Sequence, residues 1–290
     1  MEVQVSEMTS LNSWVSDIST VKSIRVYTGN AVRWCGSSRT PPGTQQQEIL
    51  HCLKAALVEW VSKFNPDQVK SKRLAEHVVC NLTQDHEKIR PEEREDIKIT
   101  AKLFIYRYEP GIIKEAATEA CLQLGVSQLD SVILALPQLP GGKCHSLEVL
   151  LPPWEELESL VQEQMVTSIG VSDMDREMLE TFCLNVQQVQ PSSCQVNLAS
   201  CCVIPPELTA FANENGIQLL THNDPPDILP VEMLQEALSA KLQDPGISEW
   251  VPRWILRYSA IIKDRGIIRS KGYMVKAERT ATHHRVCPEP

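Results

Sequence analysis

The sequence has no long apolar run, no basic excess and no secretory leader. A helix that crosses a membrane needs about 18 to 20 consecutive apolar residues, and no such run occurs. The net charge is −9, which argues against a nucleic-acid partner because phosphate binding needs a basic face. The amino terminus carries Glu2, Glu7 and Asp17 in place of the basic and then apolar layout of a signal peptide.

Closely spaced cysteine pairs of the kind found in secreted disulfide frameworks are also lacking. Ten cysteines are spread over 290 residues, which is not the dense pattern of a small secreted domain. We therefore expect a cytoplasmic protein with reduced thiols. His283 and His284 lack the spacing and neighbours of a metal site, so the sequence predicts no bound metal.

The order of the apolar runs predicts an α/β fold. Short apolar runs alternate with amphipathic segments, as in βαβ units with a parallel sheet. The predicted strands cover residues 23–34, 94–103, 132–136, 166–171, 194–198, 217–221 and 265–271. The predicted helices cover residues 45–64, 114–124, 154–164, 177–186, 206–215, 231–242 and 248–263.

A single (β/α)8 barrel of the TIM type is the predicted architecture. Such a barrel needs about 250 residues, and right-handed βα units in series can close into one. An open doubly wound sheet satisfies the same alternation, but the G-x-G-x-x-G turn that usually follows its first strand is absent. We predict a flexible segment at residues 1–22, the barrel at 23–275 and a loose tail at 276–290.

Two predicted strands resemble the active-site strands of aldo-keto reductases. R-E-D-I-K-I-T-A-K-L, residues 94–103, is similar to the family's R-E-D-L-F-I-T-S-K-L, and Lys102 falls on the catalytic lysine. L-D-S-V-I-L-A-L-P, residues 129–137, is similar to L-D-L-Y-L-I-H-W-P, but Ala135 stands where the catalytic histidine belongs. The segment before Lys102 also lacks the D-x-x-x-x-Y pair that supplies the aspartate and the proton-donating tyrosine.

Carbonyl reduction needs a proton donor and a group that orients the carbonyl. The resemblance therefore implies a barrel that has lost reductase chemistry. Within it we expect Lys102 to be a vestigial lysine that is buried or at the rim and paired with a carboxylate.

The same resemblance implies positions for a nicotinamide. I-G-V-S-D, residues 169–173, is similar to I-G-V-S-N, whose serine and asparagine hold the nicotinamide amide together with a glutamine of the next strand. The matching residues Ser172, Asp173 and Gln195, with His222, form a candidate pocket at the carboxyl ends of the strands, where barrels bind ligands. Residues 268–271, I-R-S-K, do not have the residue order of the family's I-P-K-S strand, which binds the 2′-phosphate of the cofactor. We therefore predict no cofactor, with NADPH as the alternative.

Longer segments are similar to the regulatory (modifier) subunits of glutamate–cysteine ligase, and the chain is identified as a member of that family. The similar segments are Q-V-N-L-A-S-C-C-V at 195–203, Q-L-L-T-H-N-D-P at 218–225, E-W-V-P at 249–252, L-R-Y-S at 256–259 and R-G-I-I-R-S-K-G-Y at 265–273. The resemblance implies a non-catalytic subunit that forms a heterodimer with the catalytic subunit of the ligase. It implies a higher effective affinity for glutamate and weaker feedback inhibition by glutathione. The alternatives are a residual NADPH-dependent carbonyl reductase and a nucleotide-sensing barrel.

Two further groups of residues are candidates for contact with a partner. Adjacent cysteines rarely bridge each other because the geometry is strained, so Cys201 or Cys202 could form a disulfide with another subunit. The alternative is that both are small apolar residues, since free cysteine is often buried. Aromatic residues and arginine are enriched in interface hot spots. The predicted helix at 248–263 would place four such residues on one face, Trp250, Arg253, Trp254 and Arg257.

Overall fold

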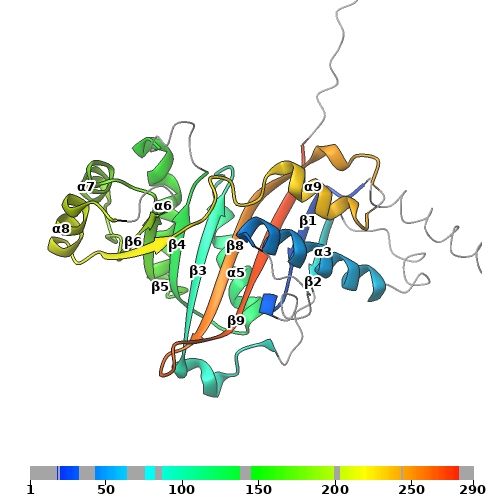
Figure 1. The fold of residues 1–290 in the computed structure, drawn as a ribbon, viewed down its shortest axis with the longest axis horizontal. Coiled ribbons are helices and arrows are strands. Elements are labelled where there is room, and N and C mark those ends of the chain that lie inside the picture. Colours follow the sequence, from blue (N-terminus) through cyan, green and yellow to red (C-terminus); the bar gives the residue numbers. More distant parts are fainter. Residues whose placement is uncertain are drawn as a thin grey trace, which may run out of the picture.

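The computed structural model describes most of the chain, and its strands form one nine-stranded sheet (Figure 1). The described residues are 18, 20–32, 43–63, 76–81, 87–137, 145–198, 203–242 and 244–280. The strand order across the sheet is β2-β1-β9-β8-β3-β4-β5-β6-β7. The α/β class with parallel strands is confirmed, and the sheet divides into a parallel half and a half built around an antiparallel hairpin.

The parallel half follows the alternation expected from the sequence. Its strands are β3 (Ile97–Ile105), β4 (Leu129–Ala135), β5 (Val166–Ser172), β6 (Ser193–Asn197) and β7 (Gln218–His222). The connecting helices are α5 (Ile112–Leu124), α6 (Leu147–Gln162), α7 (Arg176–Asn185) and α8 (Pro206–Glu214). Local signals set the ends of these helices. Gly125 closes α5 in the left-handed conformation, and the Asp175 side chain accepts a hydrogen bond from the Met178 N–H at the start of α7.

The hairpin half departs from the barrel expected from the sequence. Strands β8 (Trp250–Ile262) and β9 (Ile267–Arg279) form an antiparallel hairpin that lies between β3 and β1 (Ser23–Tyr27). Strand β2 (His77–Asn81) pairs with the other side of β1. Within the described residues the sheet therefore has two edges, β2 and β7, and does not close into the expected ring of eight parallel strands. The physical reason is that the hairpin takes up the backbone hydrogen bonds that β1 and β3 would offer to other neighbours.

The helix predicted at 248–263 is wrong, because this segment is strand β8, preceded by the short 3-10 helix η4 (Ile247–Glu249). Pro252 removes a helical hydrogen-bond donor, and the following residues are mainly β-branched or aromatic. The register shifts between Pro252 and Trp254. This irregularity accompanies the placement of Trp250 in one core cluster and Trp254 in the other.

Helices cover both faces of the sheet (Figure 1), and a hydrophobic cluster lies on each face. Helices α3 (Gln45–Lys63) and α9 (Val231–Ser239), both expected from the sequence, pack on the face that carries Val26, Val78 and Val275. Helices α5 to α8 pack on the opposite face. Apolar residues on both faces are what a central sheet in such a layered fold requires.

The expected region boundaries shift at both ends of the body. Ile18 and Val21 are buried in the core, so the body begins before residue 23. The Arg279 guanidinium donates to the backbone oxygens of both residues, at 3.0 and 2.7 Å. Strand β9 continues to Arg279 and so extends beyond the predicted boundary at 275.

Candidate functional site

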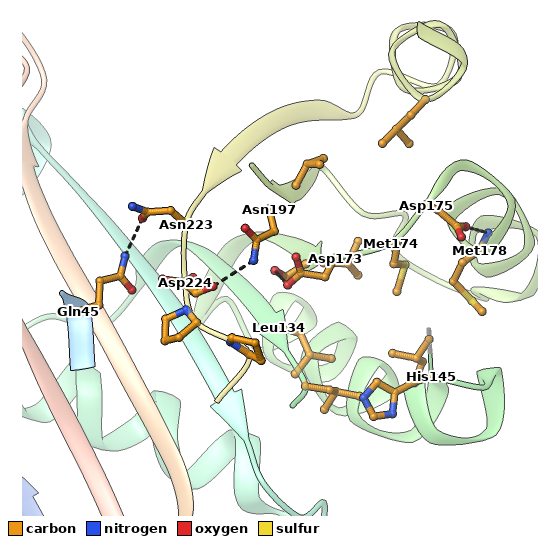
Figure 2. A pocket seen from close by; sticks show the side chains of 18 of the residues that line it. Gln45, Leu134, His145, Asp173, Met174, Asp175, Met178, Asn197, Asn223 and Asp224 are labelled. Atoms are coloured by element: carbon orange, nitrogen blue, oxygen red, sulfur yellow. Dashed lines mark hydrogen bonds between the residues drawn. The ribbon is translucent and has the colours of Figure 1, made fainter. Parts of the chain in front are cut away.

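A cavity of about 970 Å³ opens at the carboxyl ends of β4 to β7, and we call it the mouth cavity (Figure 2). The first turn of α3, with Gln45, forms one side, and the segment that follows β7 forms another. Figure 2 shows Asp173, Asn197 and Asp224 gathered on one side, with Leu134 and Met178 on other walls. This volume lies in the range of about 300–1,000 Å³ typical of ligand pockets.

Lys102 anchors a buried network beside the mouth cavity. Its side chain is 4% exposed, and its ammonium lies 2.8 Å from Asp224 Oδ2 and 2.9 Å from Ser172 Oγ. Lys102 lies directly opposite Arg257 in the register of β3 and β8. Like charges at such positions repel each other. Asp224 relieves the repulsion, since Arg257 donates to both of its oxygens, at 2.5 and 3.2 Å.

His222 connects the two carboxylates of the network. Its Nε2 lies 2.9 Å from Asp173 Oδ1, and its Nδ1 lies 3.1 Å from both the backbone nitrogen and Oδ2 of Asp224. In a neutral ring Nδ1 accepts the backbone N–H of Asp224 and the proton on Nε2 is donated to Asp173. In the charged ring both nitrogens donate, one to Asp173 and the other to Asp224. We define the ion network as Lys102, Ser172, Asp173, His222, Asp224 and Arg257.

Ser172 and His222 do not form a working nucleophile–base pair. Ser172 Oγ lies 3.3 Å from His222 Nε2 but donates its proton to Asp173 Oδ2 at 2.7 Å. A general base needs a free lone pair toward the nucleophile, and the Nε2 position carries the proton in this arrangement. The geometry therefore holds side chains in place and does not activate the Ser172 hydroxyl.

The pKa values of Asp224 and His222 are shifted toward their charged forms, whereas that of Lys102 is shifted away from its charged form. Burial would raise the pKa of Asp224, but hydrogen bonds from His222 and Arg257 outweigh it and hold that pKa well below its usual range. Burial would lower the pKa of His222, but hydrogen bonds to Asp173 and Asp224 raise it overall. Burial lowers the pKa of Lys102, and the charge of Asp224 offsets part of this effect.

Among the described residues, neither Ala135 nor Tyr106 supplies the proton donor that the reductases have beside the catalytic lysine. Ala135 presents only a methyl group and lies opposite Phe104 in the register of β3 and β4. Tyr106 lies at a small adjoining cavity, where its hydroxyl donates to Asp227 Oδ1 at 2.7 Å and accepts the Leu229 N–H at 2.9 Å. Burial and the Asp227 carboxylate raise the pKa of Tyr106 far above its usual range. A phenol with a raised pKa is a poor acid, so these residues do not support reductase chemistry.

The mouth cavity does not fit a phosphorylated nicotinamide dinucleotide. Its described lining contains Glu48, Asp173, Asp175 and Asp224 but no lysine or arginine. Phosphates need cations or free N–H groups. In the I-R-S-K segment that departs from the family's phosphate strand, Arg269 pairs with Glu93 and Lys271 with Glu48. The described lining therefore offers no cation to the phosphates of NADPH.

The structure brings together three of the four predicted pocket residues. Ser172, Asp173 and His222 belong to the ion network, and Gln195 is the register neighbour of Ser172 on β6. The Gln195 Oε1 atom is buried and has no hydrogen-bond partner in the described structure. Asp224, the centre of the network, was not among the predicted site residues. A carboxylate that closely follows a predicted apolar strand, at 217–221, was the feature of the sequence that could have indicated it.

The candidate partner surface on residues 250–257 is corrected by the structure. Trp250 and Trp254 are fully buried and lie in different core clusters. Arg253 pairs with Glu109 and Glu278, while Arg257 belongs to the ion network. These four residues therefore do not form one exposed face.

The remaining predicted features concern cysteines, metals and membranes. Cys201 and Cys202 lie outside the described residues. Among the described cysteines, Cys121, Cys183 and Cys194 are free thiols. The described part of the chain has no group of three or more histidine, cysteine or acidic side chains that could hold a metal. It also contains no helix that is long and apolar enough to cross a membrane.

Comparison with known proteins identifies relatives of two kinds. The chain matches the profile of the aldo/keto reductase family over residues 68–223. It is 29% identical over 160 residues to a glycerol 2-dehydrogenase (NADP(+)) from Hypocrea jecorina, covering 49% of each chain. Among solved structures, an aldo-keto reductase from a Medee basin deep-sea metagenome library aligns with a TM-score of 0.36 and 23% identity, covering 47% of this chain and 46% of that one.

The second kind of relative covers nearly the whole chain. The glutamate–cysteine ligase regulatory subunit of Homo sapiens is 46% identical over 263 residues, which is 90% of this chain and 95% of the human one. The subunit of Rattus norvegicus gives the same identity and coverage. The chain belongs to the family of glutamate–cysteine ligase regulatory subunits, within the aldo/keto reductase family.

Proposed function

We propose that this chain is a non-catalytic regulatory subunit that binds the catalytic subunit of glutamate–cysteine ligase as a heterodimer. In this role it raises the effective affinity of the ligase for glutamate and relaxes feedback inhibition by glutathione, in the first step of glutathione synthesis. The observation that carries the proposal is 46% identity over 95% of the human regulatory subunit. We place this function in the cytoplasm.

The physical requirement for such regulation is differential binding. A subunit changes the affinity of its partner only if it binds one conformation of that partner more tightly than another. A rigid body with a paired, buried ion network suits this role, because it presents a fixed surface. In the described structure neither Ala135 nor Tyr106 supplies a proton donor beside Lys102, and this supports a regulatory rather than a reductive function.

The test is a kinetic assay of the purified catalytic subunit with and without this chain. We expect this chain to lower the KM for glutamate and to weaken the inhibition by glutathione. The absence of both association and any kinetic change would contradict the proposal. In parallel, this chain alone should not oxidise NADPH with carbonyl substrates. Turnover that is abolished by Lys102→Met would instead favour a residual reductase.

A disulfide between the subunits through Cys201 or Cys202 is a separate proposal. Non-reducing gels of the oxidised complex should show a crosslinked band that Cys201→Ser or Cys202→Ser removes. A crosslink that persists in both single variants and in the double variant would assign the disulfide to another cysteine. The free Cys183, which is half-buried on α7, offers a matched control in Cys183→Ser.

A further inference from the structure

A second cavity, of about 240 Å³, lies beneath the hairpin and shares no lining residue with the mouth cavity. We call it the hairpin cavity. Its walls come from the end of β1, from β8 and β9, and from the carboxyl end of α5. Neither the relationship to reductases nor the regulatory role assigns a function to this place.

Two of its lining hydroxyl groups are buried and form no hydrogen bond of normal length and angle among the described residues, namely those of Tyr27, which is 1% exposed, and Ser270, which is 5% exposed. Burial raises the pKa of Tyr27, and the nearby Glu119 carboxylate raises it further. Ser270 lies close enough to the Tyr258 hydroxyl to offset part of the effect of burial, which raises the pKa of Tyr258. Buried polar groups without partners are rare and costly, so two at one cavity indicate that something polar occupies it.

Charges of both signs also line the hairpin cavity. The Arg269 guanidinium donates to the backbone oxygens of Glu87 and Lys88 and pairs with Glu93. A guanidinium has five N–H donors, so these three bonds leave spare donors. The Glu87 carboxylate supplies a negative charge close to Gly29, and the amide of the buried Gln123 adds a neutral donor and acceptor.

The size of the cavity limits the class of ligand. A water molecule takes up about 30 Å³, so the cavity has room for roughly eight waters or for a compact molecule of about ten non-hydrogen atoms. A dinucleotide, with several times that number of atoms, is too large. A ligand with one anionic and one cationic group, next to hydrogen-bonding atoms, matches Arg269, Glu87 and the free hydroxyl groups.

We propose that the hairpin cavity binds a free α-amino acid. The ligand carboxylate is bound by Arg269 and by the Tyr27 or Ser270 hydroxyl, and the ammonium group faces Glu87. The site joins β1, β9 and α5, so occupancy ties the hairpin to the rest of the body. The choice of L-glutamate and L-cysteine as probes rests on the proposed function, but the site itself is tested without the ligase.

The experiment is isothermal titration calorimetry of the full chain with L-glutamate and with L-cysteine under reducing conditions. We expect saturable one-to-one binding of at least one of them. Ser270→Ala should weaken that binding about tenfold, the effect of one lost hydrogen bond to a charged group. N-acetyl-L-glutamate, which lacks the ammonium group, should not bind.

Controls make the outcome decisive. Ser172→Ala alters the mouth cavity and should leave the dissociation constant unchanged, and Gln123→Leu provides a second variant in the hairpin cavity. The proposal is overturned by the absence of saturable binding of both amino acids at millimolar concentration. It is also overturned if Ser172→Ala abolishes binding while Ser270→Ala and Gln123→Leu do not. Because no ligase is present, failure of the regulatory role would not change this result.

Discussion

The mouth cavity and the hairpin cavity differ in how their buried polar groups are paired. Beside the mouth cavity, Lys102, Arg257 and His222 all contact Asp224, so each charge has a partner. In the hairpin cavity, the hydroxyl groups of Tyr27 and Ser270 have none among the described residues. The first arrangement stabilises the fold when it is complete, and the second is what a site open to a ligand requires. Mutations in the two places should therefore change stability in opposite directions.

The largest expected effect is in the ion network. Asp224→Ala leaves Lys102 and Arg257 facing each other without a carboxylate. We expect the free energy of unfolding to fall by about 3–5 kcal/mol, the usual cost of breaking a buried ion pair. Urea denaturation at pH 7 measures it. The control is Glu76→Gln, which breaks a pair of the same 2.8 Å length to Lys22 on the surface, where the side chains are 66% and 60% exposed. It should cause no measurable change.

The next largest effect concerns the close approach of β9 to the segment after β1. A Cβ at Gly272 would lie 2.2 Å from the backbone oxygen of Gly29 and 2.8 Å from the ring of Tyr258. Gly272→Ala should therefore lower the free energy of unfolding by about 1–3 kcal/mol, as expected of overpacking. Gly266, at the hairpin turn, has a φ of +62° but nothing within 4 Å. Gly266→Ala should cost about 1 kcal/mol through backbone conformation alone, and an equal loss in both variants would contradict the steric explanation.

A third effect is a pH dependence that comes from His222. Its pKa is raised in the folded protein, so its contribution to stability is fully present below the unfolded value of about 6.5 and is lost as the pH rises through the folded pKa. We expect His222→Gln to narrow the difference in unfolding free energy between pH 6 and pH 8.5. Urea denaturation across this range tests it. His51→Gln, on an exposed position of α3, should leave the wild-type profile unchanged.

Asp224 acts at the opposite end of the pH scale. Its pKa is lowered in the folded protein, so its contribution is present above the unfolded value of about 3.9 and is lost as the pH falls through the folded pKa. The stability contributed by His222 and Asp224 together should therefore be greatest at mildly acidic pH, between these two windows. A stability that increased steadily from pH 6 to pH 8.5 would contradict the assignment to His222.

The smallest effect has the opposite sign. Tyr27→Phe or Ser270→Ala removes a buried hydroxyl that has no partner in the described structure. We expect the free energy of unfolding of the ligand-free chain to rise by up to about 1 kcal/mol. Ser168→Ala is the matched control in the parallel half, because Ser168 Oγ donates to the backbone oxygen of Asp130 at 2.8 Å. Removal of this hydrogen bond should lower the free energy of unfolding by about 1 kcal/mol. A decrease of the same size for Ser270→Ala would show that the Ser270 hydroxyl is paired.

The sequence by itself determined the elements of the parallel half of the molecule and showed that the catalytic histidine of the reductases is missing. Amphipathic and apolar runs alternate there with clear ends, such as Gly125 after α5, so elements could be located from local pattern alone. Polar residues at the carboxyl ends of parallel strands meet at one edge. Consistent with that rule, Ser172, Asp173 and His222, at the ends of β5 and β7, lie close together. The absence of a histidine at Ala135 could also be seen without a structure.

The tertiary structure decided the hairpin half and the pairing within the site. Apolar residues four positions apart share a face in a helix and also in a regular strand, so residues 248–263 were compatible with both. The strand is selected by hydrogen bonds to β9, which follows β8 after a short turn, and to β3, which lies far away in the sequence. The same register brings Lys102 beside Arg257, and the turn after β7 brings Asp224 to both. Such contacts depend on distances in space between distant segments, and local sequence pattern does not specify them.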